Sequence, residues 1–281
     1  MSEYVVSCTS SIDMNDEFIN NHGLYYISYH FHIGKNEYDD DFGKSYPHDK
    51  FYRDVVKAKE YGTAAISSNE YYRYFKGLIE KTDKDVLHIE MTSGISGSCS
   101  NAMMAARDIN EQGKHRVVVM DSHNASGGYA LMTRRAALNR DLGYSIEDNV
   151  ADLEEYFKTM DNYFYVNGLE MLVKGGRLPS FLGNLKIYPV LKVDHILKVV
   201  KKCLNKTKAQ VELLKGFDIP ADEDAEVIII HSNCLEDALE FEQVLLRKYS
   251  NIKSVDVSQA GPVIGCHIGP GTVSLFAGKM K

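Results

Sequence analysis

The chain has 281 residues, of which 44% are hydrophobic and 25% charged, so a folded protein with a sizeable core is expected and a disordered chain is excluded. Acidic and basic residues are interleaved, the formal net charge is −7, and no Lys/Arg cluster indicates a surface for nucleic acid or for an anionic membrane. We therefore expect a small molecule or another protein as the partner, no nucleic acid, and at most transient membrane contact.

The N-terminal segment Met1–Val6 lacks the basic and long apolar regions of a signal peptide, and no apolar run approaches the ~20 residues that span a bilayer. The five cysteines, at positions 8, 99, 203, 234 and 266, form no C-x-x-C pair. This pattern indicates neither a disulfide framework nor a zinc site. Together these features predict a cytoplasmic protein.

Strand-like and helix-like segments alternate along the first half of the chain, which is typical of a sheet covered by helices. A turn at 34–36 is expected directly after the predicted strand Leu24–Ile33. Asp49 is expected to cap a helix that ends near Gly62. The predicted strands are Tyr4–Val6, Leu24–Ile33, Val86–Met91 and Val117–Met120. The further predicted helices are Glu70–Lys81, Ala102–Ile109, Ser126–Asn139 and Ile146–Met160.

The second half repeats this alternation with one long helix. Its predicted strands are Phe164–Val166, Ile187–Val193, Val227–Ile230, a strand near Val255, and Val273–Phe276, and its helix is Leu235–Tyr249. We therefore expect an α/β protein of two domains. Residues 1–160 would form an N-terminal domain of three layers, with a mostly parallel sheet and helices on both faces. Residues 161–281 would form a smaller, mixed α/β domain, and the ligand site would lie between or bordering the two.

Small hydroxyl-rich loops follow several of the predicted strands, before the next helix. They occur at 9–11, at 92–94, at Ser122 with Ser126, and at 231–232. Ligands of open α/β sheets bind outside the carboxyl ends of the strands, and a helix N-terminus favours an anion. Each loop alone is also explained by capping of the helix that follows it. The pattern therefore suggests the position of an anion site rather than the identity of a ligand.

Two glycine-rich segments add candidate anion ligands. In Lys174–Arg177 an arginine follows a glycine pair, and arginine is suited to gripping a carboxylate or phosphate through paired hydrogen bonds. In Gly265–Gly271 a single histidine, His267, lies in what we interpret as a rigid loop with accessible backbone N–H groups. A solvated surface arginine and a histidine with only a structural hydrogen bond remain the simpler alternatives.

The residues of these segments, and their order along the chain, resemble the motifs of the DegV family across nearly the whole chain. Residues 9–13 resemble its D-S-S-A-D, residues 92–98 its S-S-G-L-S-G-T, and residues 121–128 its D-S-x-x-x-S-x-G. Residues 36–38 with 51–52 are similar to its G-K-E-Y-x-D…F-Y, residues 174–178 to its K-G-G-R-I, and residues 265–271 to its G-T-H-x-G-P-G. Each motif is weak alone, but all of them in family order are specific.

The resemblance implies a long-chain fatty acid bound in a buried tunnel. It also implies a non-enzymatic role as the binding subunit that presents the carboxylate to a bacterial fatty acid kinase, within phospholipid metabolism. No metal or cofactor is implied besides the fatty acid ligand. The implied head-group contacts are Thr63, Ser93, Gly94, Arg177 and His267, with Thr92, Ser96, Ser126 and Gly176 around them.

The chain departs from the family pattern at two places. The family's T-S-Q-P-S reads Thr63-Ala64-Ala65-Ile66-Ser67 here, which keeps only the first hydroxyl of its T-S pair. The segment between Arg177 and Pro189 is shorter than usual, and N-I-K-P reads Lys186-Ile187-Tyr188-Pro189. These differences fall where the resemblance places the tunnel or the partner surface, so they bear on chain-length preference and on the kinase served.

Four other functions remain to be weighed. A serine hydrolase acting on acyl esters predicts a G-x-S-x-G elbow, and residues 94–98 match it except for the final glycine. A nucleotide-binding enzyme is disfavoured, because neither a Walker A motif nor G-x-G-x-x-G occurs. His30 and His32 share a strand face, but two histidines without a third ligand only weakly suggest a metal site. A pure scaffold protein would bind no lipid.

Overall fold

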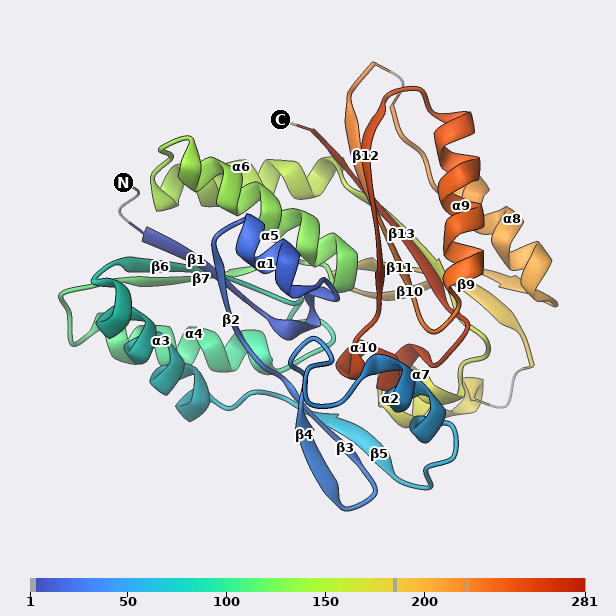
Figure 1. The fold of residues 1–281 in the computed structure, drawn as a ribbon, viewed down its shortest axis with the longest axis horizontal. Helices are drawn as coiled ribbons and strands as arrows, with labels where there is room; N and C mark the ends of the chain where they lie inside the picture. Colours follow the sequence, from blue (N-terminus) through green and yellow to red (C-terminus); the bar gives the residue numbers. More distant parts are fainter. Residues whose placement is uncertain (1–3, 184–185, 221, 281) are drawn as a thin grey trace.

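The protein is described here by a computed structural model, which covers residues 4–183, 186–220 and 222–280 (Figure 1). Its first sheet is four-stranded and entirely parallel, in the order β2-β1-β6-β7. The strands are β1 (Tyr4–Thr9), β2 (Leu24–Ile27), β6 (Asp85–Glu90) and β7 (Val117–Asp121). They are short runs rich in β-branched and other apolar residues, as expected for a sheet buried on both faces.

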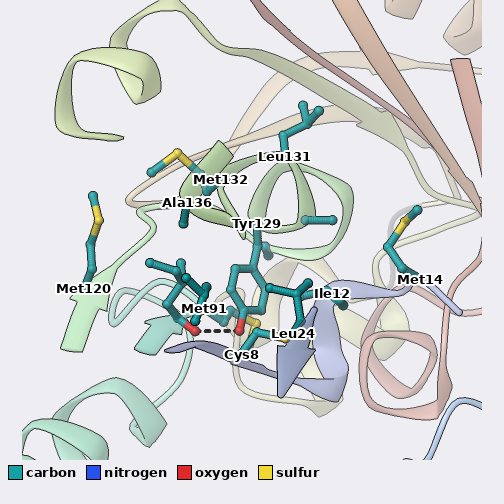
Figure 2. Packing of buried hydrophobic residues seen from close by; sticks show 14 of the residues in the cluster. Cys8, Ile12, Met14, Leu24, Met91, Met120, Tyr129, Leu131, Met132 and Ala136 are labelled. Atoms are coloured by element: carbon teal, nitrogen blue, oxygen red, sulfur yellow. Dashed lines mark hydrogen bonds between the residues drawn. The ribbon is translucent and has the colours of Figure 1, made fainter. Parts of the chain in front are cut away.

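Helices cover both faces of this sheet (Figure 1). On one face lie α3 (Ser68–Thr82) and α4 (Ser98–Asn110), and on the other α1 (Asp16–Asn21), α5 (Ser126–Asp141) and α6 (Ile146–Thr159). The start of α3 is fixed by a capping box, in which Ser67 and Glu70 each satisfy the other's backbone N–H. Figure 2 shows the core beneath α5, where Tyr129 packs among Cys8, Ile12 and Met91 and donates a hydrogen bond to the backbone oxygen of Ile89 at 2.7 Å.

The second sheet has six strands, mixes parallel and antiparallel pairs, and runs in the order β10-β9-β8-β13-β11-β12. Its strands are β8 (Asp161–Tyr165), β9 (Tyr188–Asp194), β10 (Ile196–Cys203), β11 (Ala225–His231), β12 (Ile252–Gln259) and β13 (Val273–Lys279). One face packs under α8 (Lys206–Gly216) and α9 (Leu235–Lys248). The opposite face meets α5 through Phe276, so the two sheets share one apolar core.

A small antiparallel sheet of order β4-β3-β5 lies below the parallel sheet (Figure 1). It is formed by β3 (His30–Ile33), β4 (Asn36–Asp39) and β5 (Tyr61–Ala64). The predicted turn at 34–36 closes its β3–β4 hairpin, with Gly34 at φ +61°. Next to it lie α2 (His48–Val55), α7 (Glu170–Lys174) and α10 (Pro262–Ile268), and the 3-10 turns are η1 (Ser10–Ile12) and η2 (Ser180–Leu182).

The expected α/β class and the parallel sheet with helices on both faces are confirmed, whereas the domain boundary near residue 160 stays a prediction. The single strand predicted at Leu24–Ile33 is wrong, because the chain leaves the parallel sheet after Ile27 and begins β3 in another sheet at His30. The helix cap at Asp49 is also wrong, because α2 begins at His48 after Pro47 and ends at Val55. The loop expected around His267 is instead the last turn of α10.

Several other elements escaped the sequence analysis, among them β10 and α8. Strand β10 was not predicted because apolar and polar residues do not alternate in its sequence, and α8 was not predicted because its apolar stripe is short. The edge strand β10 also concentrates Lys198, Lys201 and Lys202, although no lysine cluster was expected. Lysines on an edge strand discourage pairing with a strand of another molecule. No helix among the described residues is both long and apolar enough to cross a membrane.

Candidate functional site

A cavity lies where α10, the small sheet and the inner face of the six-stranded sheet meet the loop after β6, and the space in and around it that protein atoms leave free, including space open to solvent, is about 840 Å³. Most of its walls are apolar, with Leu172, Val193, Leu197, Val263, Ile264 and Phe276 among the lining residues. A narrow set of polar side chains interrupts them, comprising Tyr29, Thr63, Ser96, Ser126, Arg177, His267 and Ser274.

Arg177 reaches the cavity from the turn that ends α7. Gly176, at φ +72°, allows the chain to reverse, and the backbone N–H of Arg177 donates to the oxygen of Leu172 at 2.9 Å. The guanidinium donates to two backbone oxygens, from Nε to Ile95 at 3.2 Å and from Nη1 to Gly175. No carboxylate forms an ion pair with it among the described residues. Burial lowers the pKa of Arg177, but a guanidinium stays charged in proteins, so the cavity contains one cation without an acidic partner.

His267 lies beside Arg177, in the last turn of α10. Burial, with a smaller effect of the Arg177 charge, lowers the pKa of His267 to about 3, so the imidazole is neutral near pH 7. Its Nε2 is 3.0 Å from the hydroxyl oxygen of Thr63, and its Nδ1 is buried without a partner among the described residues. The arginine is therefore the one charge of this cluster, which suits a single monovalent anion.

Thr63 comes to this cluster from β5, where it pairs with Phe31 of β3. A neutral imidazole carries one N–H, on either Nε2 or Nδ1. With the proton on Nε2, the ring donates to Thr63 and leaves the threonine O–H free. With the proton on Nδ1, Thr63 donates to Nε2 and leaves the Nδ1 proton free. Either tautomer thus leaves one donor without a protein partner.

Ser93 and Gly94 lie elsewhere, in a more open groove that adjoins the cavity. Both are exposed, and Gly176 lines the same groove. The N–H of Ser93 donates to Asp121 at 3.0 Å, and the N–H of Gly94 donates to the Thr92 hydroxyl at 3.3 Å, so neither backbone donor is free. Arg177 lines both spaces, as do 95–97 and Leu197. The structure thus brings Thr63, Arg177 and His267 together and leaves Ser93 on the other side of Arg177.

Thr92 is buried next to this groove and holds two loops together. Its hydroxyl donates to the backbone oxygen of His195, in the turn between β9 and β10, at 2.8 Å. A β-carbon on Gly94 would stand 1.9 Å from that same oxygen, so only glycine fits here. The glycine of this motif therefore allows two loops to touch, and its predicted role as a backbone donor to a ligand stays a prediction.

The chain is similar to known proteins in both sequence and structure. A family profile described as "uncharacterised protein, DegV family" matches residues 5–279. The chain belongs to the DegV family. It is 31% identical to Protein DegV of Bacillus subtilis over 233 residues, which are 80% of this chain and 82% of that protein. It is 25% identical to DegV domain-containing protein YteA of Lactococcus lactis, over 99% of this chain and 98% of that protein.

Solved structures of DegV proteins share the whole fold. A structure described as DegV, a fatty acid binding protein from Bacillus subtilis, matches with a TM-score of 0.89 and 26% identity, covering 100% of both chains. A second, described as fatty acid binding of a DegV family protein from Thermus thermophilus, matches with a TM-score of 0.88 and 26% identity, also over 100% of both. The DegV resemblance found in the motifs is thus confirmed.

The sequence analysis missed several polar residues of the cavity region, among them Glu90 and Tyr29. Glu90, fully buried, accepts hydrogen bonds from the hydroxyls of Tyr29 (3.1 Å) and Tyr71 and from the N–H of Met91 (2.9 Å), and lies 3.2 Å from Nε2 of His88. The Tyr29 hydroxyl is in turn 3.2 Å from Ser96 on the cavity wall. A charged residue inside the apolar strand Val86–Met91 was the available signal for this network.

The other candidate chemistries find little support at this site in the DegV chain. Ser96 contacts the Tyr29 hydroxyl and the N–H of Ser98, and no histidine bonds to Ser93 or Ser96 among the described residues, so neither serine has a general base. His30 is held by Asp39 and Glu70, each at 2.7 Å. Within the described ranges, no group of three or more His, Cys, Asp or Glu side chains is arranged to hold a metal ion.

Proposed function

We propose that this DegV-family chain binds one long-chain fatty acid, with its alkyl chain in the cavity and its carboxylate at Arg177. The observation that carries the proposal is a half-buried guanidinium at the edge of an apolar cavity, with no acidic partner among the residues that the structure describes. A carboxylate at this point supplies the missing opposite charge. The solved DegV structures described as fatty acid binding, from Bacillus subtilis and Thermus thermophilus, support the same class of ligand.

The proposed head-group contacts follow from the donors that remain free. Arg177 provides the charge, and the pair of Thr63 and His267 provides one further O–H or N–H in either tautomer. A buried carboxylate is stable only when such donors meet its oxygens. We assign Ser93 and Gly94 to the groove side, where they would contact a group attached to the carboxylate rather than the carboxylate itself.

The free energy gained by burying the alkyl chain exceeds the cost of forming such a complex. Each methylene gains ~0.8 kcal/mol on leaving water, so a chain of about sixteen carbons gains on the order of 12 kcal/mol. Association and ordering cost several kcal/mol of this gain. The remainder is enough for tight binding, provided that the carboxylate is paired.

We further propose that the chain performs no chemistry alone and presents the carboxylate to a fatty acid kinase, which would form the acyl phosphate. The open groove beside Arg177 supports this role, because a phosphoryl group could approach the carboxylate from that side. Arg177 and His267 would then contribute more to binding the acyl phosphate than Ser93 does. If Arg177→Ala weakened the binding of carboxylate and acyl phosphate equally, this division of roles would be wrong.

The test is to denature the purified protein, extract it, and quantify fatty acids by mass spectrometry. We expect close to one fatty acid per chain, or stoichiometric uptake of added palmitate or oleate. An extract without fatty acid, combined with no uptake, contradicts the proposal and favours a scaffold role. Labelling of Ser93 or Ser96 by a fluorophosphonate probe would instead support the acyl ester hydrolase.

A further inference from the structure

Two serines line the cavity from elements that carry neither Arg177 nor His267. Ser126 is the first residue of α5, and Ser274 lies within β13. These elements touch, because a β-carbon on Gly127 would stand 2.5 Å from the ring of Phe276. Phe276 is two residues beyond Ser274 and so lies on the same strand face, about 7 Å along the strand. The two serines therefore flank the Phe276 part of the cavity wall.

Ser274 is a polar residue in an apolar setting. It pairs with Phe164 of β8 and with Ile230 of β11, and only 5% of its surface is exposed. Its hydroxyl forms no hydrogen bond with any residue that the structure describes. The Ser274 oxygen is not one of the fully enclosed polar atoms, so it is open to the cavity that it lines. A hydroxyl that meets only apolar groups there is left without a hydrogen bond, so we expect a molecule that fills the cavity to supply a partner.

Ser126 already has one hydrogen-bond partner. Its hydroxyl lies 2.5 Å from Oδ2 of Asp13, and Oδ1 of Asp13 accepts the N–H of Gly261 at 2.8 Å. Burial raises the pKa of Asp13 well above its usual range, so the proton shared in this contact can belong to either oxygen. Ser126 can therefore donate to a ligand or accept from it, and so can Ser274. Such a pair complements a ligand group that both donates and accepts, as a hydroxyl group does.

We propose that Ser126 and Ser274 form a second polar subsite, which binds a hydroxyl group carried by the alkyl chain of a long-chain fatty acid. The inference rests on the proposed function, because it takes a fatty acid as the ligand. The ligand hydroxyl forms one hydrogen bond with each serine, donating in one and accepting in the other. An alkyl chain without a hydroxyl group, whether saturated or unsaturated, can neither donate nor accept a hydrogen bond, so it leaves Ser274 without a partner. A hydroxyl at another carbon is buried against apolar walls.

The test measures dissociation constants for stearate and for a panel of octadecanoic acids that each carry one hydroxyl at a different mid-chain carbon. We expect one positional isomer to bind about tenfold more tightly than stearate, and isomers hydroxylated elsewhere to bind more weakly. In Ser274→Ala that advantage is lost, whereas stearate binds at least as tightly as to the unmodified protein, because no unpaired hydroxyl remains beside its alkyl chain. Ser258→Ala, in the edge strand β12, which is separated from β13 by β11, is the matched control and keeps the advantage.

Ser274→Cys is the second variant, should the alanine variant fold poorly, and it is also expected to lose the advantage because a thiol is a weak donor. The proposal is overturned if no isomer binds more tightly than stearate, or if the advantage survives in both Ser274 variants. Failure of stearate itself to bind contradicts the proposed function instead, so the two failures are distinguishable.

Discussion

A β-carbon on Gly175 would stand 2.2 Å from Nδ1 of His267, so these two residues touch only because position 175 has no side chain. The contact joins the end of α7 to the last turn of α10, which come from distant parts of the sequence. It also brings Arg177, two residues after Gly175, to the cavity wall that His267 lines. The first glycine of the Lys174–Arg177 motif is thus required by its neighbour across the cavity edge.

Gly175→Ala is therefore expected to displace His267 or to separate α7 from α10, because the ring is buried and held by Thr63. We predict a loss of fatty acid affinity of about tenfold or more, comparable to losing one hydrogen bond to a charged group. Calorimetric or fluorescence titration with palmitate measures it. Gly77→Ala in α3 is the control, since nothing lies near that position, and it should leave binding unchanged. Unaltered affinity in Gly175→Ala would show that the contact is unimportant for the ligand.

Removing the cation should abolish the preference for a charged head group. Arg177→Ala is expected to weaken palmitate binding by about 10- to 100-fold, as expected for one charge-assisted interaction, and to leave hexadecanol binding nearly unchanged. Competition binding with both ligands measures the ratio. Arg107→Ala, which removes an exposed arginine of α4 that lies 4.0 Å from Glu111, should change neither ligand. Equal losses for acid and alcohol in Arg177→Ala would contradict a carboxylate contact.

Many of the strands and helices were predictable, because the periodicity of apolar residues within each segment specifies them. The runs Val86–Met91 and Val117–Met120 became β6 and β7 almost as predicted, and Ser126–Asn139 became α5, since buried strands and helices of this length are specified by their own periodicity. The strand predicted at Leu24–Ile33 failed for a non-local reason. The alternation continues through Ser28, but the partner strands change there from β1 to β4 and β5.

The candidate site was predictable only through the family motifs. Thr63, Arg177 and His267 lie on three separate elements, and nothing in their spacing shows that they converge on one cavity. Ser93 belongs to the most recognisable motif yet lines the neighbouring groove, in a loop where the N–H of Ser93 donates to Asp121 and that of Gly94 to Thr92. Ser274 gives no signal in the sequence, because its proposed role depends on its hydroxyl having no hydrogen-bond partner among the described residues of the folded protein.

Asp40 gives a pH dependence of stability with a definite sign. Burial raises the pKa of Asp40 from 3.8 to about 7 in the folded protein. The folded state thus holds a proton that the unfolded state has released, so this residue's contribution to stability is present below about pH 4 and lost as the pH rises towards 7. Asp40→Asn should therefore gain stability relative to the unmodified protein between about pH 5 and pH 8. Urea unfolding at pH 5 and pH 8 measures the free energy of unfolding of both proteins. If the difference between Asp40→Asn and the unmodified protein were the same at both pH values, the raised pKa of Asp40 would be contradicted.

Arg134 is predicted to support the junction of α5 with the six-stranded sheet. Its guanidinium contacts Glu226 of β11 at 2.7 Å and Asp256 of β12 at 2.6 Å, with 15% of the arginine side chain exposed. Arg134→Ala should lower the free energy of unfolding by about 3–5 kcal/mol, because it leaves Glu226 buried without its cation. Arg116→Ala breaks an exposed pair with Glu147 and should cost about 0–1 kcal/mol. Similar losses for the two variants in chemical denaturation would argue against a buried ion pair.

The most direct test of the central claim is a crystal structure of the protein loaded with palmitate. It should show the alkyl chain along the apolar walls and one carboxylate oxygen within hydrogen-bond distance of the Arg177 guanidinium. The other oxygen should be near Thr63 or His267. An alkyl chain bound elsewhere, or a carboxylate pointing away from Arg177, would contradict the account.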